Sequence, residues 1–120
     1  MPATNPFVGQ LSAVAFNFAP VGWLDCDGQL LQIAEYETLY TLLGTTYGGD
    51  GETTFALPDL RGRVPLHEGE GRDLKAATLA ATAGGQNLAE FQEEGDPLKT
   101  LPTLAVRWII AVEGTYPSRD

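Results

Sequence analysis

The stretch LLGTTYGGDGETTFALPDLRGRVPLH, from Leu42 to His67, decides the fold because it specifies so much of the backbone. Pro58 and Pro65 fix φ at about −65° and lack an amide donor. Glycine reaches positive φ without strain, and it occupies four closely spaced positions here: Gly44, Gly48, Gly49 and Gly51. The stretch therefore predicts, in order, the end of a helix, a glycine-rich loop, a short strand and an Arg-Gly-Arg turn.

The composition favours a small, mostly β protein. The chain has 120 residues, of which 43% are hydrophobic, and it contains 14 glycines and eight prolines. So many glycines and prolines argue against a helix bundle and suit turns between short strands. We therefore predict an α+β, mostly β fold: a single domain of short antiparallel strands, with one α-helix at about 35–43 and long glycine-rich loops.

The charge balance excludes one class of partner. Sixteen acidic and seven basic residues give a net charge of −9, which would repel a phosphate backbone, so we expect no nucleic-acid binding. No apolar run reaches the roughly 18 to 20 residues that span a bilayer, so we expect no membrane insertion. The first residues show no basic leader, and we expect synthesis in the cytoplasm without a signal peptide.

Alternating apolar residues predict three strands. The first runs from Phe7 to Phe18 and the second from Trp23 to Asp27. A turn at Asp27-Gly28 follows, after which Leu30-Leu31 is expected to continue the pairing. Near the other end of the chain, 104–113 has an uninterrupted apolar face, and we expect this strand to form the centre of the core.

A helical period replaces the alternation from Glu35 to Leu43. Gly44 suits the position just past the end of this helix, and Ala34 is a poor cap at its start. Between 68 and 100 the chain is rich in Ala, Gly and Glu, which predicts a long excursion with a short strand near 87–91.

The sequence LPDLRGR places one carboxylate close to two guanidinium groups, those of Asp59, Arg61 and Arg63. The planar guanidinium groups can bind backbone carbonyls, or the carboxylates of Asp25 and Asp27, through two parallel hydrogen bonds. We expect these residues to brace loops against the sheet rather than to bind a ligand, because basic residues are scarce elsewhere in the chain. We assign a structural role to three further residues: Gly48, Gly49 and Trp23.

Metal-binding patterns are weak in this sequence. The segments 25–28 and 49–52 are superficially similar to calcium loops, but neither continues into the spaced ligands of an EF-hand, so turn chemistry explains both. A closed zinc site needs four ligands, whereas His67 and Cys26 supply only two. His67 is the one axial metal candidate, since copies of it from several subunits could share an ion on a symmetry axis. Cys26 is expected to be a small buried apolar residue.

Catalytic motifs are missing as well. The chain has no G-x-S-x-G elbow, no phosphate-cradling loop and no second histidine to pair with Cys26 or a serine. Glu68 and Glu70 are expected to be solvated loop charges rather than a general acid and base. We therefore predict no enzymatic activity and no cofactor. An acidic hydrolase would need two carboxylates joined in one pocket, and nothing in the sequence pairs them.

Three segments carry a resemblance to a known family. They are FVGQLSAVAFNFAPVGWLDCDGQLL, the run EYETLYTLLGTTYGGDGETTFALPDLRGRVPLHEGEG, and LAVRWIIAVEGTYPSR near the C-terminus. Within them stand GWxxCDGQ, LLGTTYGGDG and LPDLRGRVP. With these motifs the sequence resembles the phage tail collar domain family, which includes the bacterial microcystin-dependent proteins.

The resemblance implies a non-enzymatic module of phage tail fibres and related contractile or adhesive appendages, usually a homotrimer. It implies a platform made of 1–67 and 103–118, and a variable region at 68–102 that presents a surface to a receptor or partner. It also implies a location in a virion, a tail-like particle or an extracellular appendage. The expected partners are other tail or appendage proteins and a cell-surface glycan receptor.

This chain departs from its relatives in the variable region. Relatives often carry a Pro-Ser-His-Thr-His type motif there, whereas this chain has no histidine after Phe91. We identify it as a short variant that lacks the histidine-containing receptor-binding insertion. The partner-binding candidates that remain are Glu68, Glu70, Phe91, Glu93 and Glu94.

A second reading is a lectin-like protein that binds carbohydrate. In that case Trp23, Tyr47 or Tyr116 would offer a stacking face to a sugar, beside Asp or Asn hydrogen-bonding groups.

Overall fold

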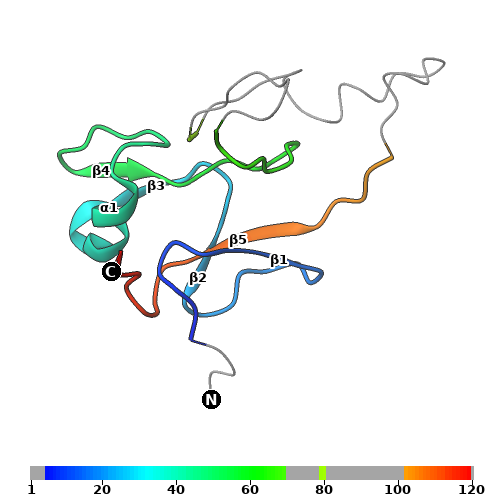
Figure 1. Cartoon of the computed structure of the whole chain (residues 1–120), viewed down its shortest axis with the longest axis horizontal. Helices are drawn as coiled ribbons and strands as arrows, with labels where there is room; N and C mark the ends of the chain where they lie inside the picture. Colours follow the sequence, from blue (N-terminus) through cyan, green and yellow to red (C-terminus); the bar gives the residue numbers. More distant parts are fainter. Residues whose placement is uncertain (1–4, 70–78, 81–101, 120) are drawn as a thin grey trace. The chain divides into compact units, whose positions relative to one another are not determined.

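The computed structural model describes residues 5–69, 79–80 and 102–119 (Figure 1). The chain divides into two compact units, one made of Met1–Asp59 with Ala105–Asp120 and the other of Leu60–Leu104. The described helices and strands all belong to the first unit. The division expected from the sequence, with 68–102 as a variable region, stays a prediction.

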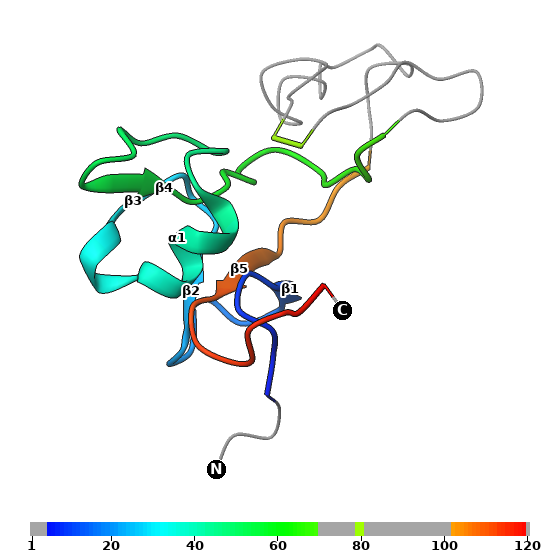
Figure 2. The ribbon, with the colours of Figure 1, turned by 60° about the vertical axis from the view of Figure 1, so that its left-hand side comes forward.

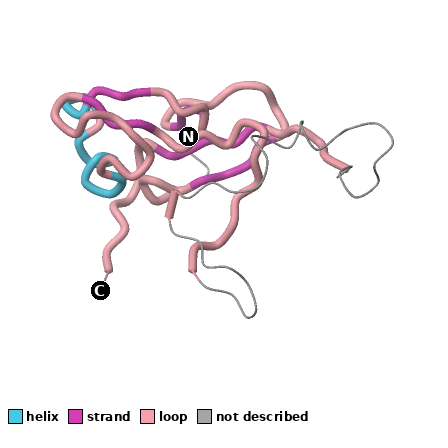
Figure 3. The backbone as a smooth tube through the Cα atoms, turned by 90° about the horizontal axis from the view of Figure 1, so that it is seen from above, coloured by secondary structure: helices cyan, strands magenta, loops and turns pink. Residues whose placement is uncertain are grey.

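The predicted fold class is confirmed. The described chain contains short antiparallel strands and one α-helix, and Figure 3 shows loops and turns over most of its length. None of the helices in this described part is long and apolar enough to cross a membrane.

A three-stranded antiparallel sheet holds the centre of the core. Its strands, in spatial order, are β1 (Leu11–Val14), β5 (Arg107–Ala111) and β2 (Trp23–Asp25) (Figure 1). Three successive residues of β5, Ile109, Ile110 and Ala111, are buried. Successive side chains of a strand point to opposite faces, so both faces of β5 are covered. The expected central place of this strand is confirmed, although its ladder begins only at Arg107.

A second sheet and two helical segments complete the first unit. They are β3 (Leu30–Gln32), the 3₁₀ turn η1 (Ile33–Glu35), α1 (Glu37–Leu43) and β4 (Thr54–Ala56). The rings of Tyr40 on α1 and Phe55 on β4 pack with their centroids 5.3 Å apart. The helix therefore lies next to this sheet (Figure 2). Gly44 ends the helix with a φ of 54°, and its N–H donates to the carbonyl of Tyr40 at 2.8 Å, as predicted.

The first strand is shorter than the sequence predicts. The prediction of a strand from Phe7 to Phe18 is wrong, because the ladder ends at Val14 and the chain then bends. Phe16 and Phe18 are exposed and pack against each other, with ring centroids 4.8 Å apart. Their apolar alternation therefore reflects this mutual contact and not a cross-strand partner.

The pairing of Leu30-Leu31 with the second strand is also wrong. β3 pairs with β4, with Leu31 opposite Phe55. At the turn, the N–H of Gly28 donates to the carbonyl of Pro58 at 3.2 Å, and Asp27 forms a bridge with Asp59. These contacts lead the chain away from β2 and toward β4.

The helix begins later than expected. Its N-cap is Tyr36 rather than Ala34, and no side chain caps it. Tyr36 has φ −133° and ψ 48°, outside the helical region, so the expected helix is split into η1 and α1 at this residue.

The segments that precede β1 and follow β5 are tied together. The N–H of Val8 donates to the carbonyl of Thr115 at 3.0 Å, and the N–H of Thr115 donates to the carbonyl of Pro6 at 2.8 Å. The side-chain amide of Asn5 adds a hydrogen bond to Oγ1 of Thr115 at 2.7 Å. These three hydrogen bonds fix the position of the chain where it enters β1.

Candidate functional site

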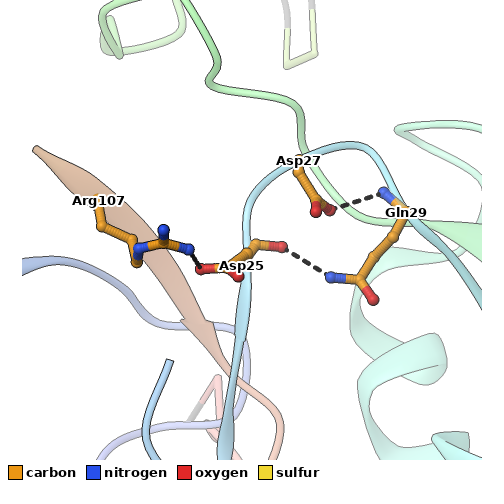
Figure 4. Close-up of polar contacts among 4 residues, drawn as sticks. All are labelled: Asp25, Asp27, Gln29 and Arg107. Atoms are coloured by element: carbon orange, nitrogen blue, oxygen red, sulfur yellow. Dashed lines mark hydrogen bonds and ion pairs between the residues drawn. The ribbon is translucent and has the colours of Figure 1, made fainter. Parts of the chain in front are cut away.

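Four polar residues lie close together where β2 ends: Asp25, Asp27, Gln29 and Arg107 (Figure 4). Asp25 is the last residue of β2 and stands opposite Ile109 of β5. Arg107 lies two residues from Ile109, so its side chain emerges on the same face of the sheet as Asp25. Its Nη1 donates to Oδ1 of Asp25 at 2.8 Å, and both side chains are about one-third exposed, at 37% and 31%. The ion pair thus joins β2 to β5.

The turn after β2 is held by its own side chains (Figure 4). Oδ1 of Asp27 accepts a hydrogen bond from the N–H of Gln29 at 3.2 Å, and Nε2 of Gln29 donates to the carbonyl of Asp25 at 3.1 Å. Gly28 stands between them with a φ of 75°, and a Cβ there would lie 3.2 Å from Cβ of Asp59. The polar groups of this turn are therefore used to fix the backbone.

Cys26, inside the same turn, is buried, as predicted. Burial, followed by the negative charges of Asp25 and Asp27, raises the pKa of its thiol from 9.0 to about 12. At neutral pH the group is a thiol, whereas a nucleophile or a metal ligand must be a thiolate. The local environment therefore opposes both kinds of chemistry.

The glycine-rich loop before β4 is closed by one carboxylate. Oδ1 of Asp50 accepts hydrogen bonds from the N–H groups of Glu52, Thr53 and Thr54 at 2.8, 2.9 and 3.0 Å. The hydroxyl of Thr53 donates to Oδ2 at 3.2 Å. The hydrogen bonds from Thr54, Thr53 and Glu52 hold the pKa of Asp50 well below its usual range. The hydrogen bonds of a turn, rather than an ion, thus explain why a carboxylate stands at position 50, as the sequence predicts.

Two glycines of this loop lie close to β4. Gly48 has a φ of 131°, and a Cβ added there would lie 3.1 Å from Cβ of Ala56. Gly49 has a φ of 95°, and an added Cβ would come within 2.7 Å of the carbonyl oxygen of Thr54 and 2.8 Å of the nitrogen of Phe55. Gly44, Gly48, Gly49 and Gly51 all have positive φ, as predicted, and the loop backbone at Gly49 is packed directly on the strand.

The Arg-Gly-Arg turn lies in the second unit. The N–H of Arg63 donates to the carbonyl of Leu60 at 3.1 Å, and Gly62 has a φ of 67°. The bracing of Asp25 or Asp27 by Arg61 and Arg63 stays a prediction, and so does the structural role of Asp59.

Arg107 is the residue that sequence reasoning missed. It was assigned only a place on the C-terminal strand, and its partner Asp25 is 82 positions away. The signal that could have identified it is its position as the one charged side chain within β5.

The other candidates do not converge on a site. His67 and Glu68 are exposed, and no group of three His, Cys, Asp or Glu side chains within 5–69, 79–80 and 102–119 is arranged to hold a metal ion. Trp23 and Tyr47 are half-buried, and Tyr116 is exposed. Four of the expected partner-binding residues lie outside the described residues: Glu70, Phe91, Glu93 and Glu94.

The comparison with protein families matches a segment that contains most of this geometry, with Arg107 outside it. The family model described as the Phage Tail Collar Domain matches residues 9–65, which confirms the resemblance over that segment. The match includes β1, β2, the turn at Asp27, α1, the loop of Asp50 and β4. No curated protein matches the chain.

Proposed function

We propose that this chain is a non-enzymatic structural and attachment module of a phage tail fibre or of a related tail-like or adhesive appendage. The match of residues 9–65 to the Phage Tail Collar Domain carries the proposal, since that family is a structural module of tail fibres. The geometry supports it, because the side chains of Asp27, Gln29 and Asp50 in the matched segment bind the chain's own backbone. Such a segment holds a shape and presents neighbouring residues.

Three observations describe how the module keeps its shape. The Arg107–Asp25 ion pair joins two strands, and the carboxylate of Asp50 closes the glycine-rich loop through three backbone N–H groups. The side chains of Phe55 on β4 and Leu39 on α1 are fully buried. A fixed platform of this kind suits a component that must transmit force or position a binding surface at the end of a fibre.

Incorporation into a particle tests the structural role. Tail-like particles from cells that encode the chain are separated on a density gradient, and each fraction is probed with an antibody against the chain. We expect the chain to sediment with the particles in a constant ratio to the other tail proteins. Recovery of the chain only in the free protein fraction would count against a tail component.

The attachment role resides, in this proposal, in the region 68–102. We expect its replacement by a short Gly-Ser linker to leave incorporation into particles unchanged and to abolish adsorption of the particles to cells. A matched substitution within the platform, Leu30→Ser, should leave adsorption unchanged, because Leu30 lies on β3 at the surface of the first unit. Unchanged adsorption after the replacement would refute the role of 68–102.

We further propose a homotrimeric assembly with other tail proteins as neighbours. Each copy carries a net charge of −9, so contact between copies has to overcome mutual repulsion. We expect added salt to strengthen the assembly, since it screens that repulsion. A sugar receptor for the assembled tip is tested on a glycan array, where saturable binding that disappears with 68–102 is the expected result.

A further inference from the structure

The central strand of the three-stranded sheet comes from the far end of the chain. β1 and β2 belong to the N-terminal segment 5–59, whereas β5, which lies between them, belongs to the C-terminal segment 105–119. In the described residues β1 and β2 do not pair with each other, and each pairs only with β5 (Figure 1). The N-terminal segment therefore supplies two strands with a slot between them, and the C-terminal segment fills this slot.

Backbone hydrogen bonds hold the C-terminal segment on both of its sides. On the β1 side, the N–H of Ala111 donates to the carbonyl of Gln10 at 2.9 Å, and the carbonyl of Ala111 accepts from the N–H of Gly9 at 2.9 Å. On the β2 side, the N–H of Cys26 donates to the carbonyl of Trp108 at 3.0 Å. Main-chain hydrogen bonds of this kind give an added strand much of its affinity for a sheet.

The side chains of β5 define which strand fits the slot. Ile109, Ile110 and Ala111 are only 2%, 1% and 0% exposed. Ile110 stands opposite Leu11 of β1 and Leu24 of β2, in the middle of the sheet. A charged side chain at this position would have to leave water, which is costly, so the slot selects an apolar strand.

Contacts at the two ends of the segment fix its register. At the start of β5, Nη1 of Arg107 donates to Oδ1 of Asp25 at 2.8 Å. Past its end, the N–H of Thr115 donates to the carbonyl of Pro6 at 2.8 Å, and the N–H of Val8 donates to the carbonyl of Thr115 at 3.0 Å. A shift by one residue would break these contacts and move every side chain of β5 to the opposite face. The slot thus specifies both the sequence and the position of the segment.

We propose that the slot between β1 and β2 is a strand-binding site whose ligand is the segment 105–119, which stays bound without the covalent link through 60–104. That link raises the local concentration of the segment, but the contacts described above all join 5–59 to 105–119. The inference does not depend on the proposed role in a tail. It implies that 60–104 can change in length or sequence while the first unit keeps its fold.

Cleavage of the folded full chain tests whether the link is needed. A recognition sequence for a site-specific protease is inserted within 81–101, and the folded protein is cut there once. Size-exclusion chromatography at micromolar concentration and native mass spectrometry then show whether the two pieces stay together. We expect them to co-elute as one complex whose circular dichroism equals that of the uncut chain.

A synthetic peptide of residues 102–119 tests whether the slot itself binds the segment. The cleaved protein is unfolded in urea and returned to buffer with an excess of the fluorescent peptide, which should replace the natural C-terminal piece. Two peptide variants are compared, Ile110→Asp at the buried middle of β5 and Leu104→Asp at a residue that is 86% exposed. Both changes add one charge to an apolar residue, and neither alters the cleaved protein.

We expect the Leu104→Asp peptide to bind as well as the natural peptide, and the Ile110→Asp peptide to bind at least roughly a hundredfold more weakly. Separation of the pieces after cleavage, or loss of the folded circular dichroism, would overturn the inference. Equal binding of the natural and Ile110→Asp peptides would overturn it too, since the peptide would then adhere outside the slot. The role in a tail fails separately, in the density-gradient experiment.

Discussion

Gly49 lies directly against the backbone of Phe55, so closely that a Cβ on Gly49 would overlap the Cα of Phe55. Thr54 also contributes its carbonyl oxygen to this contact. The glycine-rich loop can therefore pack on β4 only where a hydrogen replaces a side chain. Shape complementarity between backbone segments, rather than side-chain chemistry, defines this part of the molecule.

Gly49→Ala should lower the free energy of unfolding by at least about 3 kcal/mol, because the methyl group meets backbone atoms that cannot move independently. Gly44→Ala is the matched control: Gly44 also has a positive φ, at 54°, but an added Cβ would meet no heavy atom within 4 Å. We expect the control to lose less, about 1 to 2 kcal/mol, because only the backbone conformation, at φ 54° and ψ −142°, opposes the methyl group. Urea unfolding of both variants measures the difference, and equal losses would show that the close approach is not rigid.

Arg107→Ala should lower the free energy of unfolding by about 1 kcal/mol, because it breaks a partly exposed ion pair between β2 and β5. High salt should reduce the loss, since screening weakens the pair in the natural chain. Arg119→Ala, at an exposed position, should change the stability by less than about 0.5 kcal/mol. A double-mutant cycle with Asp25→Asn measures the coupling, and a coupling of zero would contradict the structural role of the pair.

The Asp50 loop should make stability depend on pH in the acid range. The pKa of Asp50 lies below its ordinary value of 3.8 in the folded chain, so the unfolded chain takes up the proton first as the pH falls. The stabilisation is therefore complete above about pH 4 and is lost as the pH falls further. In Asp50→Asn the amide oxygen still accepts hydrogen bonds but has no charge to lose. We expect the urea midpoint of this variant to fall less steeply between about pH 4 and pH 2 than that of the natural chain.

Cys26 should react slowly in the folded protein. Burial keeps its pKa at about 12, so the reactive thiolate is scarce at pH 8. We expect iodoacetamide to modify the folded chain far more slowly than the chain in concentrated urea. A raised pKa also means that the contribution of this group to stability is complete below pH 9.0, its ordinary value, and is lost as the pH rises toward about 12. Equal alkylation rates in the two states would contradict the burial of the thiol.

Local patterns predicted the elements whose partners are near in sequence. The period of α1 and the positive φ of Gly44 follow from the residues themselves. Asp50 binds the N–H groups of residues two to four positions ahead, which a turn preference alone can indicate.

The errors arose where a distant segment decides the structure. Nothing near Gly28 indicates that its N–H will bind the carbonyl of Pro58 and turn the chain away from a hairpin. Arg107 likewise carries no local sign that its partner is Asp25, 82 positions away in the sequence. Alternation could not separate strand from bend at Phe16, because two rings that pack on each other repeat with the same period as a buried face.

We propose that this chain is an integral component of a tail or of a tail-like particle. Electron microscopy of native particles, with a gold-labelled antibody against the chain, tests that claim most directly. We expect the gold to lie at one fixed position on the tail or its fibres in nearly every particle. Particles that carry no gold, in cells where the chain is abundant and unattached, would contradict the claim.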